Sequence, residues 1–175
     1  MKSNLLIVLV AISALVIGVA VQMYNVADQQ SEQMPPKLEF SFPDMQEKMQ
    51  PVTQWQGKIL VINFWATWCP PCLKEIPEFI QWQQEFQPDS VQFVGIAIDD
   101  KDAVAGFLKS IGVNYPMLIA GDEGFMLARQ LGNIVNVLPF TIIVDRQGKI
   151  VHRQSGELSR AQFLEAVRPL IRSYD

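Results

Sequence analysis

Two cysteines separated by two prolines are the residues of this chain best suited to redox chemistry. Cys69 and Cys72 are the only cysteines among the 175 residues. The apolar run Ile59–Phe64 before them predicts a strand that is buried on both faces. Pro70 suits the first position of a helix, so Cys69 is expected where a helix begins and Cys72 one turn further in.

The start of a helix changes the acidity of a thiol. Its unpaired N–H groups and its positive dipole end stabilise an anion, and they therefore favour the Cys69 thiolate over the thiol. Cys72 is less exposed to this field and is expected behind Cys69. The pattern predicts an attacking thiolate at Cys69 and a resolving thiol at Cys72, a pair that cycles between dithiol and disulfide.

A metal site and an inert structural disulfide are two other uses of a cysteine pair. A zinc site needs about four ligands, usually Cys and His, and the only His of this chain is the distant His152. An inert disulfide would not need a Trp, two prolines and a strand–helix junction around it. We therefore expect redox chemistry, no bound metal, and a His152 on an edge strand without a catalytic role.

A carboxyl group near the pair is the candidate proton carrier. Glu75 lies three residues after Cys72 on the expected helix, where the two side chains are neighbours. A partly buried carboxyl has a raised pKa and exchanges a proton near neutral pH. The alternative is a solvated acid of the first turn that only favours the helix dipole. Trp68, next to Cys69, is expected on the substrate-facing surface, and Trp65 in the core.

The residues around the cysteines belong to a longer motif. It runs Asn63-Phe-Trp-Ala-Thr-Trp-Cys-Pro-Pro-Cys72, followed by Glu75 and Pro77, by Leu138-Pro139-Phe140-Thr141, and by Val144-Asp145-x-x-Gly148. From Phe40 to the C-terminus, the chain resembles the thioredoxin superfamily. Within it, the motif resembles the membrane-anchored TlpA/ResA/CcmG-like thiol-disulfide oxidoreductases.

The resemblance implies an α/β, thioredoxin-like fold with a central mixed β-sheet flanked by helices. Its TlpA-type additions are an N-terminal hairpin, expected at Leu38–Phe42 and Val52–Trp55, and a central helix–strand insertion over Lys101–Ile119. Side-chain patterns predict the remaining strands and helices over 59–64, 70–86, 91–98, 122–131, 140–144 and 150–153. Ser159 and Gln162 form a capping box for a last helix.

The resemblance also implies roles for residues outside the cysteine pair. Pro139 matches the cis-proline that packs beside the cysteines in thioredoxin-like folds, which leaves the backbone of Leu138 able to pair with a substrate segment. A proline that only begins a strand is the alternative. Trp68, Pro70 and Pro71 complete the expected substrate contacts.

Asn63 departs from thioredoxin, which usually has a buried Asp at the matching position. An amide cannot titrate, so proton transfer to and from the inner cysteine requires another acid. ResA-like proteins carry a Glu at the position of Glu75, and the resemblance therefore implies that Glu75 takes this role.

The first part of the chain has a separate composition. No charged residue occurs between Lys2 and Asp28, and the apolar stretch is long enough to span a membrane with Lys2 on the cytoplasmic side. We predict a transmembrane anchor over 1–24, a linker over 25–37 and a thioredoxin-like domain over 38–175. This places a single-pass protein in a bacterial inner membrane, with its domain in the periplasm or extracytoplasmic space. A cleaved signal peptide is the alternative for 1–24.

The implied enzyme is a thiol-disulfide oxidoreductase that reduces disulfides of exported proteins, for example in cytochrome c maturation. Its redox-active disulfide needs no further cofactor, and a membrane thiol-disulfide transporter would be its electron donor. The net charge of −4 argues against nucleic acid as a partner.

Four other functions are considered: a DsbA-like oxidant that forms disulfides, a copper-site assembly protein, a peroxidase and a non-catalytic binding module. The Pro-Pro dipeptide has no His to stabilise a thiolate, which disfavours a strong oxidant. The two-residue spacing differs from the three-residue spacing of Sco-type copper proteins. Ala66 stands where a peroxiredoxin has Thr, and the intact cysteine pair disfavours a non-catalytic module.

Overall fold

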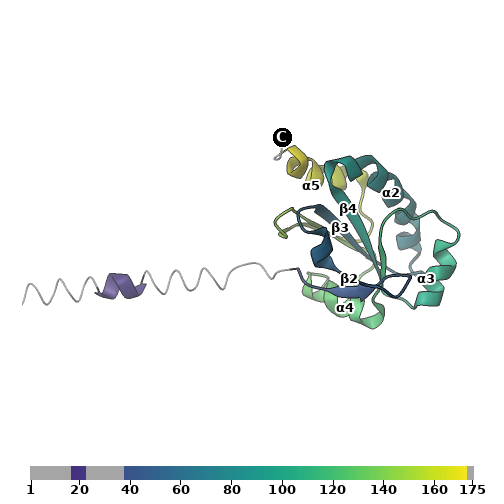
Figure 1. Ribbon diagram of the computed structural model, residues 1–175, viewed down its shortest axis with the longest axis horizontal. Coiled ribbons are helices and arrows are strands. Elements are labelled where there is room, and N and C mark those ends of the chain that lie inside the picture. Colours follow the sequence, from purple (N-terminus) through teal and green to yellow (C-terminus); the bar gives the residue numbers. More distant parts are fainter. Residues whose placement is uncertain (1–16, 23–37, 173–175) are drawn as a thin grey trace, which may run out of the picture. The chain divides into compact units, whose positions relative to one another are not determined.

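The computed structural model describes residues 17–22 and 38–172. Residues 17–22 are helical; the rest of the predicted anchor (1–24) and the predicted linker (25–37) lie outside the described residues. Within the two described ranges, no helix has both the length and the apolar composition that a membrane crossing requires. Residues 38–172 belong to one structural unit, which is built around a β-sheet (Figure 1).

The main sheet has five strands in the order β5-β4-β3-β6-β7. The central strand β3 is parallel to β4 and antiparallel to β6; β5 is parallel to β4, and β7 is antiparallel to β6. The mixed sheet predicted from the sequence is therefore confirmed. The strands are β3 (Ile59–Trp65), β4 (Val91–Ala97), β5 (Met117–Ile119), β6 (Phe140–Val144) and β7 (Ile150–Ser155).

Helices cover both faces of this sheet (Figure 1). Three of them, α2, α3 and α5, bury side chains in a core on one face, whereas α4 and the N-terminal hairpin contribute to the core on the other face. The helices are α2 (Pro70–Phe86), α3 (Lys101–Leu108), α4 (Gly121–Gln130) and α5 (Arg160–Arg172), with a short 3-10 helix η2 (Gln87–Asp89) after α2. The capping box of Ser159 and Gln162 at the start of α5 is confirmed.

Strand β3 is buried along its whole length, and its side chains contribute to the cores on both faces of the sheet. Ile59, Val61 and Trp65 pack with α2, while Leu60, Ile62 and Phe64 pack on the opposite face. Side chains of a strand alternate between faces. Asn63 therefore shares the α2 face, the face on which the cysteine helix lies.

The N-terminal hairpin is present, but its second strand was placed wrongly. β1 (Ser41–Pro43) pairs antiparallel with β2 (Met49–Pro51), and the predicted strand Val52–Trp55 is the 3-10 helix η1. Val52 and Trp55, three residues apart, are both buried against the core. A three-residue spacing matches one turn of a 3-10 helix, whereas a strand would direct these two side chains to opposite faces.

The predicted helix–strand insertion is formed by α3 and β5. Asp100 caps α3, because its side chain accepts a hydrogen bond from the Ala103 N–H. β5 extends the sheet beyond β4 and ends the sheet on that side. Asp44 of the hairpin region forms an isolated bridge to Leu118, so the hairpin adjoins the inserted strand.

Candidate active site

The cysteine pair lies at the N-terminus of α2, directly after β3. Cys69 is the N-cap residue and Pro70 opens the helix, as predicted. Cys69 and Cys72 form a disulfide with their Cα atoms 5.3 Å apart. Cys69 is 4% exposed and Cys72 is fully buried, so the outer position belongs to Cys69.

The turn between β3 and α2 is held by an aspartate from another strand end. Asp99 Oδ2 accepts hydrogen bonds from the Thr67 N–H at 2.9 Å and from Thr67 Oγ1 at 2.5 Å. Burial opposes ionisation of Asp99, but the bonds from Thr67 and from the Asp100 N–H outweigh it and lower its pKa. Asp100, the next residue, instead caps α3. Two consecutive acids after a buried strand were the one signal that Asp99 had a separate task.

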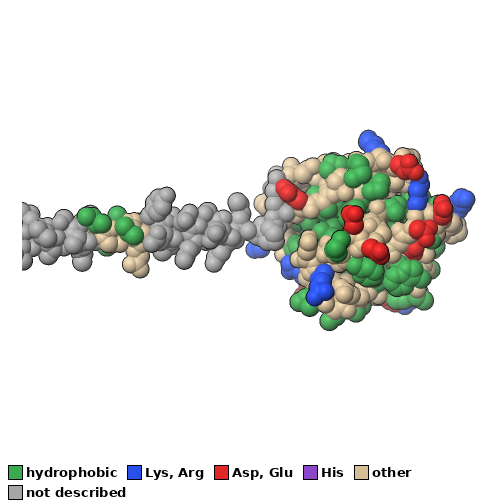
Figure 2. Space-filling model, turned by 90° about the horizontal axis from the view of Figure 1, so that it is seen from below, with side chains coloured by type: hydrophobic (Ala, Val, Ile, Leu, Met, Phe, Trp, Pro, Cys, Tyr) green, Lys and Arg blue, Asp and Glu red, His purple; other side chains and the backbone are tan. Residues whose placement is uncertain are grey.

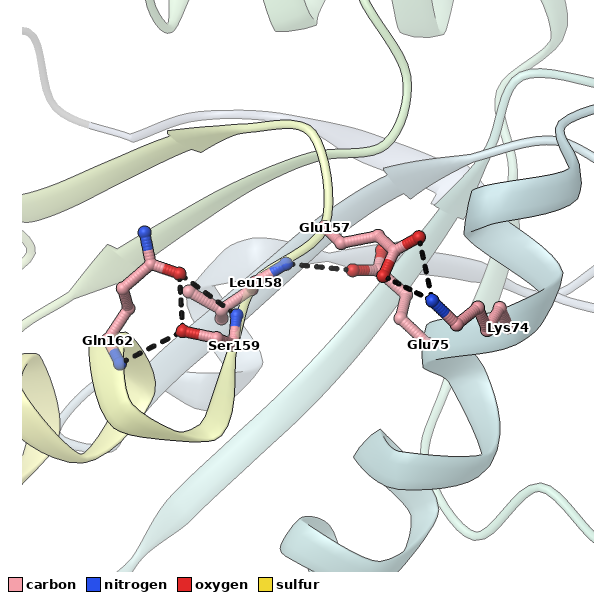
Figure 3. Close-up of polar contacts among 6 residues, drawn as sticks. All are labelled: Lys74, Glu75, Glu157, Leu158, Ser159 and Gln162. Atoms are coloured by element: carbon pink, nitrogen blue, oxygen red, sulfur yellow. Dashed lines mark hydrogen bonds and ion pairs between the residues drawn. The ribbon is translucent and has the colours of Figure 1, made fainter.

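Glu75 lies on the buried face of α2, one turn after Cys72. Its side chain is 3% exposed. Glu75 Oε1 accepts a hydrogen bond from Asn63 Nδ2 at 2.7 Å, and Oε2 accepts one from the Leu158 N–H at 3.1 Å. Figure 3 shows the second of these bonds, which joins α2 to the segment before α5. The alternative of a solvated first-turn acid is therefore wrong.

The surroundings of Glu75 set its acidity. Burial raises the pKa of Glu75 from its ordinary value of 4.5 to about 7, although the bonds from Leu158 and Asn63 stabilise the charged form and lower it. The nearby carboxylates of Glu157 and Glu78 raise it further. Glu75 can therefore hold or release a proton near neutral pH, as the sequence predicted.

A row of cross-strand neighbours surrounds Asn63 on the α2 face. Its Cα partners are Gly95 on β4 and Thr141 on β6, and Asn63 Nδ2 also donates to Thr141 Oγ1 at 3.0 Å. A side chain at Gly95 would overlap Met117 Sδ, which fills the space there. The sequence did not predict Thr141 as a support, although its position two residues after the predicted cis-proline was a usable signal.

Tyr115 is a second buried titratable group in the core next to α2. It packs against Phe93, with ring centroids 5.9 Å apart, and within the described part of the chain its hydroxyl has no hydrogen-bond partner. Burial, and then the charge of Glu75, raise the pKa of Tyr115. The phenol therefore remains neutral, and Glu75 is the group that titrates there near neutral pH.

The Leu138–Pro139 peptide bond is cis, as predicted. Phe64 and Phe140 are paired across β3 and β6, so Pro139 adjoins the end of β3 from which the cysteine turn departs. The Pro139 carbonyl accepts a hydrogen bond from the Gly156 N–H at 2.8 Å. The Leu138 N–H and C=O, by contrast, bond to no other residue in 17–22 or 38–172, and remain able to pair with an added segment.

Apolar side chains are exposed near both parts of the site. Trp68 is 60% exposed, Pro70 is exposed and Pro71 is half-buried, whereas Pro139 is buried. Just before Leu138, a short loop exposes apolar residues that the sequence did not predict as a surface, namely Ile134, Val135 and Val137. Asn133 closes this loop through hydrogen bonds with the backbone of Val137. Figure 2 shows exposed hydrophobic side chains next to acidic ones on one face of the domain.

His152 lies on β7, an edge strand, as predicted. The cysteine turn follows β3, and β6 lies between β3 and β7 in the sheet. His152 is therefore separated from the cysteine turn by one strand. Among the described residues, no group of three or more His, Cys, Asp or Glu side chains has a metal-binding arrangement.

Comparisons with known proteins agree with this geometry. Residues 32–153 match the model of the AhpC/TSA family. The chain is 30% identical over 134 residues to the thiol-disulfide oxidoreductase ResA of Bacillus subtilis (strain 168), covering 74% of this chain and 73% of ResA.

Two solved structures have the same fold. A thiol:disulfide interchange protein of the thioredoxin family from Chlorobium tepidum TLS is 29% identical, with a TM-score of 0.69 over 78% of this chain and 95% of that chain. A thioredoxin-related protein from Neisseria meningitidis serogroup B is 32% identical, with a TM-score of 0.66 over 75% and 98%. The chain therefore belongs to the AhpC/TSA family in the thioredoxin superfamily, and it is a thiol-disulfide oxidoreductase related to ResA.

Proposed function

We propose that this protein is an extracytoplasmic disulfide reductase for exported proteins, in which Cys69 attacks, Cys72 resolves and Glu75 carries the proton. The observation that carries the proposal is the buried Glu75, one turn after Cys72 on α2, with a pKa of about 7. A carboxyl group with that pKa can accept a proton from a thiol and return it at neutral pH.

The first step uses the outer cysteine. The Cys69 thiolate attacks one sulfur of the substrate disulfide, and the substrate S–S bond breaks as a Cys69–substrate disulfide forms. The N-terminus of α2 stabilises the thiolate before attack. The other substrate sulfur leaves as a thiolate and takes up a proton.

The second step uses the inner cysteine. Glu75 accepts the proton of Cys72, and the Cys72 thiolate attacks Cys69 Sγ. The mixed disulfide breaks, the Cys69–Cys72 bond forms, and the second substrate thiol is released with its proton. Two electrons have then moved from the protein dithiol to the substrate disulfide, so the cycle needs no organic cofactor.

The acid next to the pair supports the reducing direction. A carboxylate near Cys72 disfavours additional negative charge, and it therefore weakens the stabilisation of the thiolate form that makes proteins of the DsbA type strong oxidants. The residues between the cysteines, Pro70 and Pro71, supply no positive charge that would oppose this effect.

A protein substrate is supported by the surface around the site. The free backbone groups of Leu138 suit an extended segment, and the exposed apolar side chains of Trp68, Ile134 and Val135 suit its side chains. The apolar stretch at 1–24 and the ResA relatives support a location outside the cytoplasm. A reductant in that oxidising space must be recharged, and we propose a membrane thiol-disulfide transporter as the donor. Proteins of cytochrome c maturation are candidate substrates.

The reduction potential of the Cys69–Cys72 pair tests the direction. We expect a value near that of thioredoxin, about −270 mV, and well below the value of DsbA, about −120 mV. A potential near the DsbA value would reverse the proposed direction. With Glu75→Gln, reduction of a model disulfide at pH 7 should slow by about 10²-fold, the size of effect typical of a lost general acid–base group. An unchanged pH profile would remove the proton-carrying role and leave the direction standing.

A further inference from the structure

The segment that joins β7 to α5 contacts both halves of the site. The Gly156 N–H binds the carbonyl of Pro139, and the Leu158 N–H binds the Glu75 carboxyl. Gly156 has φ +83°, a left-handed conformation that favours glycine. We call residues 156–159 the β7–α5 junction. This one segment supports the proline next to the substrate position and the group that carries the proton.

Side chains hold this junction from two directions (Figure 3). On the α5 side, Ser159 Oγ donates to Gln162 Oε1 at 2.6 Å, and Gln162 Nε2 donates to Gln154 of β7 at 2.9 Å. On the α2 side, Lys74 Nζ forms an ion pair with Glu157 Oε2 at 3.0 Å. Lys74 directly precedes Glu75, and Glu157 directly precedes Leu158, so the pair joins the two chain segments that the Glu75–Leu158 bond also joins.

The charges that face Glu75 come from few elements. On α2 it is Glu78, and on the junction Glu157; Lys74 is linked to this group through its ion pair with Glu157. The neighbours on β3 and β6, Asn63 and Thr141, are uncharged, and Tyr115 stays a neutral phenol. Cys69 and Cys72 do not titrate while they are joined.

Resting on the proposed function, we propose that Lys74 and Glu157 are positioning residues for the resolving step. Their ion pair holds the junction against α2, and their charges act with opposite sign on the protonation of Glu75. Glu157 disfavours the Glu75 carboxylate, and Lys74, paired with Glu157 at 3.0 Å, offsets part of that negative charge. The balance between two exposed side chains thereby sets the pH range in which Glu75 can accept the proton of Cys72.

Two single substitutions distinguish this role from a merely structural one. Glu157→Gln and Lys74→Gln remove the same ion pair, so a structural tether would respond to both in the same way. An electrostatic role predicts opposite responses. The pair is exposed, with side chains 71% and 44% accessible, so both variants should fold.

The experiment titrates Glu75 in the oxidised full-length chain, with the carboxyl carbon followed by NMR and assigned with Glu75→Gln. Glu157→Gln should lower the midpoint, and Lys74→Gln should raise it. Each shift should be about half a pH unit, because a charge near the surface acts through a high effective dielectric and is screened by salt. The pH profile for reduction of a model disulfide should move in the same directions.

Glu85→Gln is the matched control. It removes the Glu85–Arg160 ion pair, which also joins α2 to the start of α5, but Glu85 lies ten positions, about 15 Å, along the helix from Glu75. This variant should leave the midpoint unchanged. Equal shifts in Glu157→Gln and Lys74→Gln, or no shift in either, would overturn the proposal. If the wild type does not reduce a model disulfide, the proposed function fails, and the NMR titration still decides this inference.

Discussion

Asn63 on β3 donates a 2.7 Å hydrogen bond to Glu75 on α2, so the strand before the cysteine motif supports the carboxyl group after it. The same amide nitrogen donates to Thr141 on β6. Three elements therefore meet at one neutral side chain. Because an amide cannot titrate, Asn63 supports the Glu75 carboxyl group without competing with it for a proton.

Asn63→Asp should raise the pH at which the site deprotonates. Two carboxyl groups within hydrogen-bond distance do not ionise together easily, so one of them would keep its proton to a higher pH than Glu75 does alone. We expect the midpoint for reduction of a model disulfide to move above the value of about 7 for Glu75. Thr141→Val, which alters the other partner of Asn63 without adding a charge, is the control. A midpoint shared by Asn63→Asp and the wild type would contradict this view.

Glu75 should make stability depend on pH. Its pKa is raised from 4.5 to about 7 in the folded state, so its favourable contribution is complete below pH 4.5 and is lost as the pH rises through about 7. The difference corresponds to a loss of roughly 3 kcal/mol above pH 7. Urea unfolding of the oxidised chain should show this loss, and Glu75→Gln should not. If the free energy of unfolding depended on pH in the same way in the wild type and in Glu75→Gln, Glu75 would be excluded as the source of the loss.

In the reduced chain, iodoacetamide should modify Cys69 before Cys72. Cys69 is the N-cap of α2 and the more exposed of the two, and we expect its pKa below the free-cysteine value of about 8.5. For the same reason, Cys72→Ser should accumulate a mixed disulfide between Cys69 and a substrate, because no resolving thiol remains. Cys69→Ser is the paired control. Adducts that form on Cys69→Ser and not on Cys72→Ser would reverse the two roles.

Asp99→Ala should loosen the turn that carries Trp68 and Cys69. It removes the acceptor of two hydrogen bonds from Thr67, at a cost of about 1–3 kcal/mol in unfolding free energy. Attack by Cys69 on a model disulfide should slow as well. Asp100→Ala is the neighbouring control: it removes the cap of α3 at a cost of about 1 kcal/mol and should leave the rate of attack unchanged. Equal rates in the two variants would show that Asp99 does not position the turn.

The sequence predicted the elements whose side chains follow a regular period. The helix over Pro70–Phe86 was predicted with its observed bounds, because a proline marks its start and one face is continuously apolar. Val52–Trp55 was predicted as a strand from the resemblance to the TlpA-type hairpin, but it is a 3-10 helix whose buried residues, Val52 and Trp55, are three positions apart. The local sequence pattern does not show which residues of this segment are buried, because their burial depends on the core that the segment covers.

The site was predictable where side-chain type carries the chemistry. Cys69, Cys72 and Glu75 followed from spacing on one helix, and Pro139 from the resemblance. Leu158 could not be predicted, because it contributes a backbone N–H that any residue type would supply. The different roles of Asp99, which binds Thr67, and Asp100, which caps α3, could not be predicted either. Two adjacent acids look equivalent in a sequence, and only the position of the turn in space distinguishes them.

The alternation of faces along β3 has a consequence for folding. A pairing error of one residue would carry Asn63 into the opposite core and bring Phe64 beneath α2. The amide would then be buried without Glu75 or Thr141, at a cost of about 1–3 kcal/mol. The residue that supports the carboxyl thus also penalises a misaligned central strand. An apolar residue in place of Asn63 is therefore expected to reduce the fraction of chains that reach one uniquely paired sheet, independently of its effect on the proton.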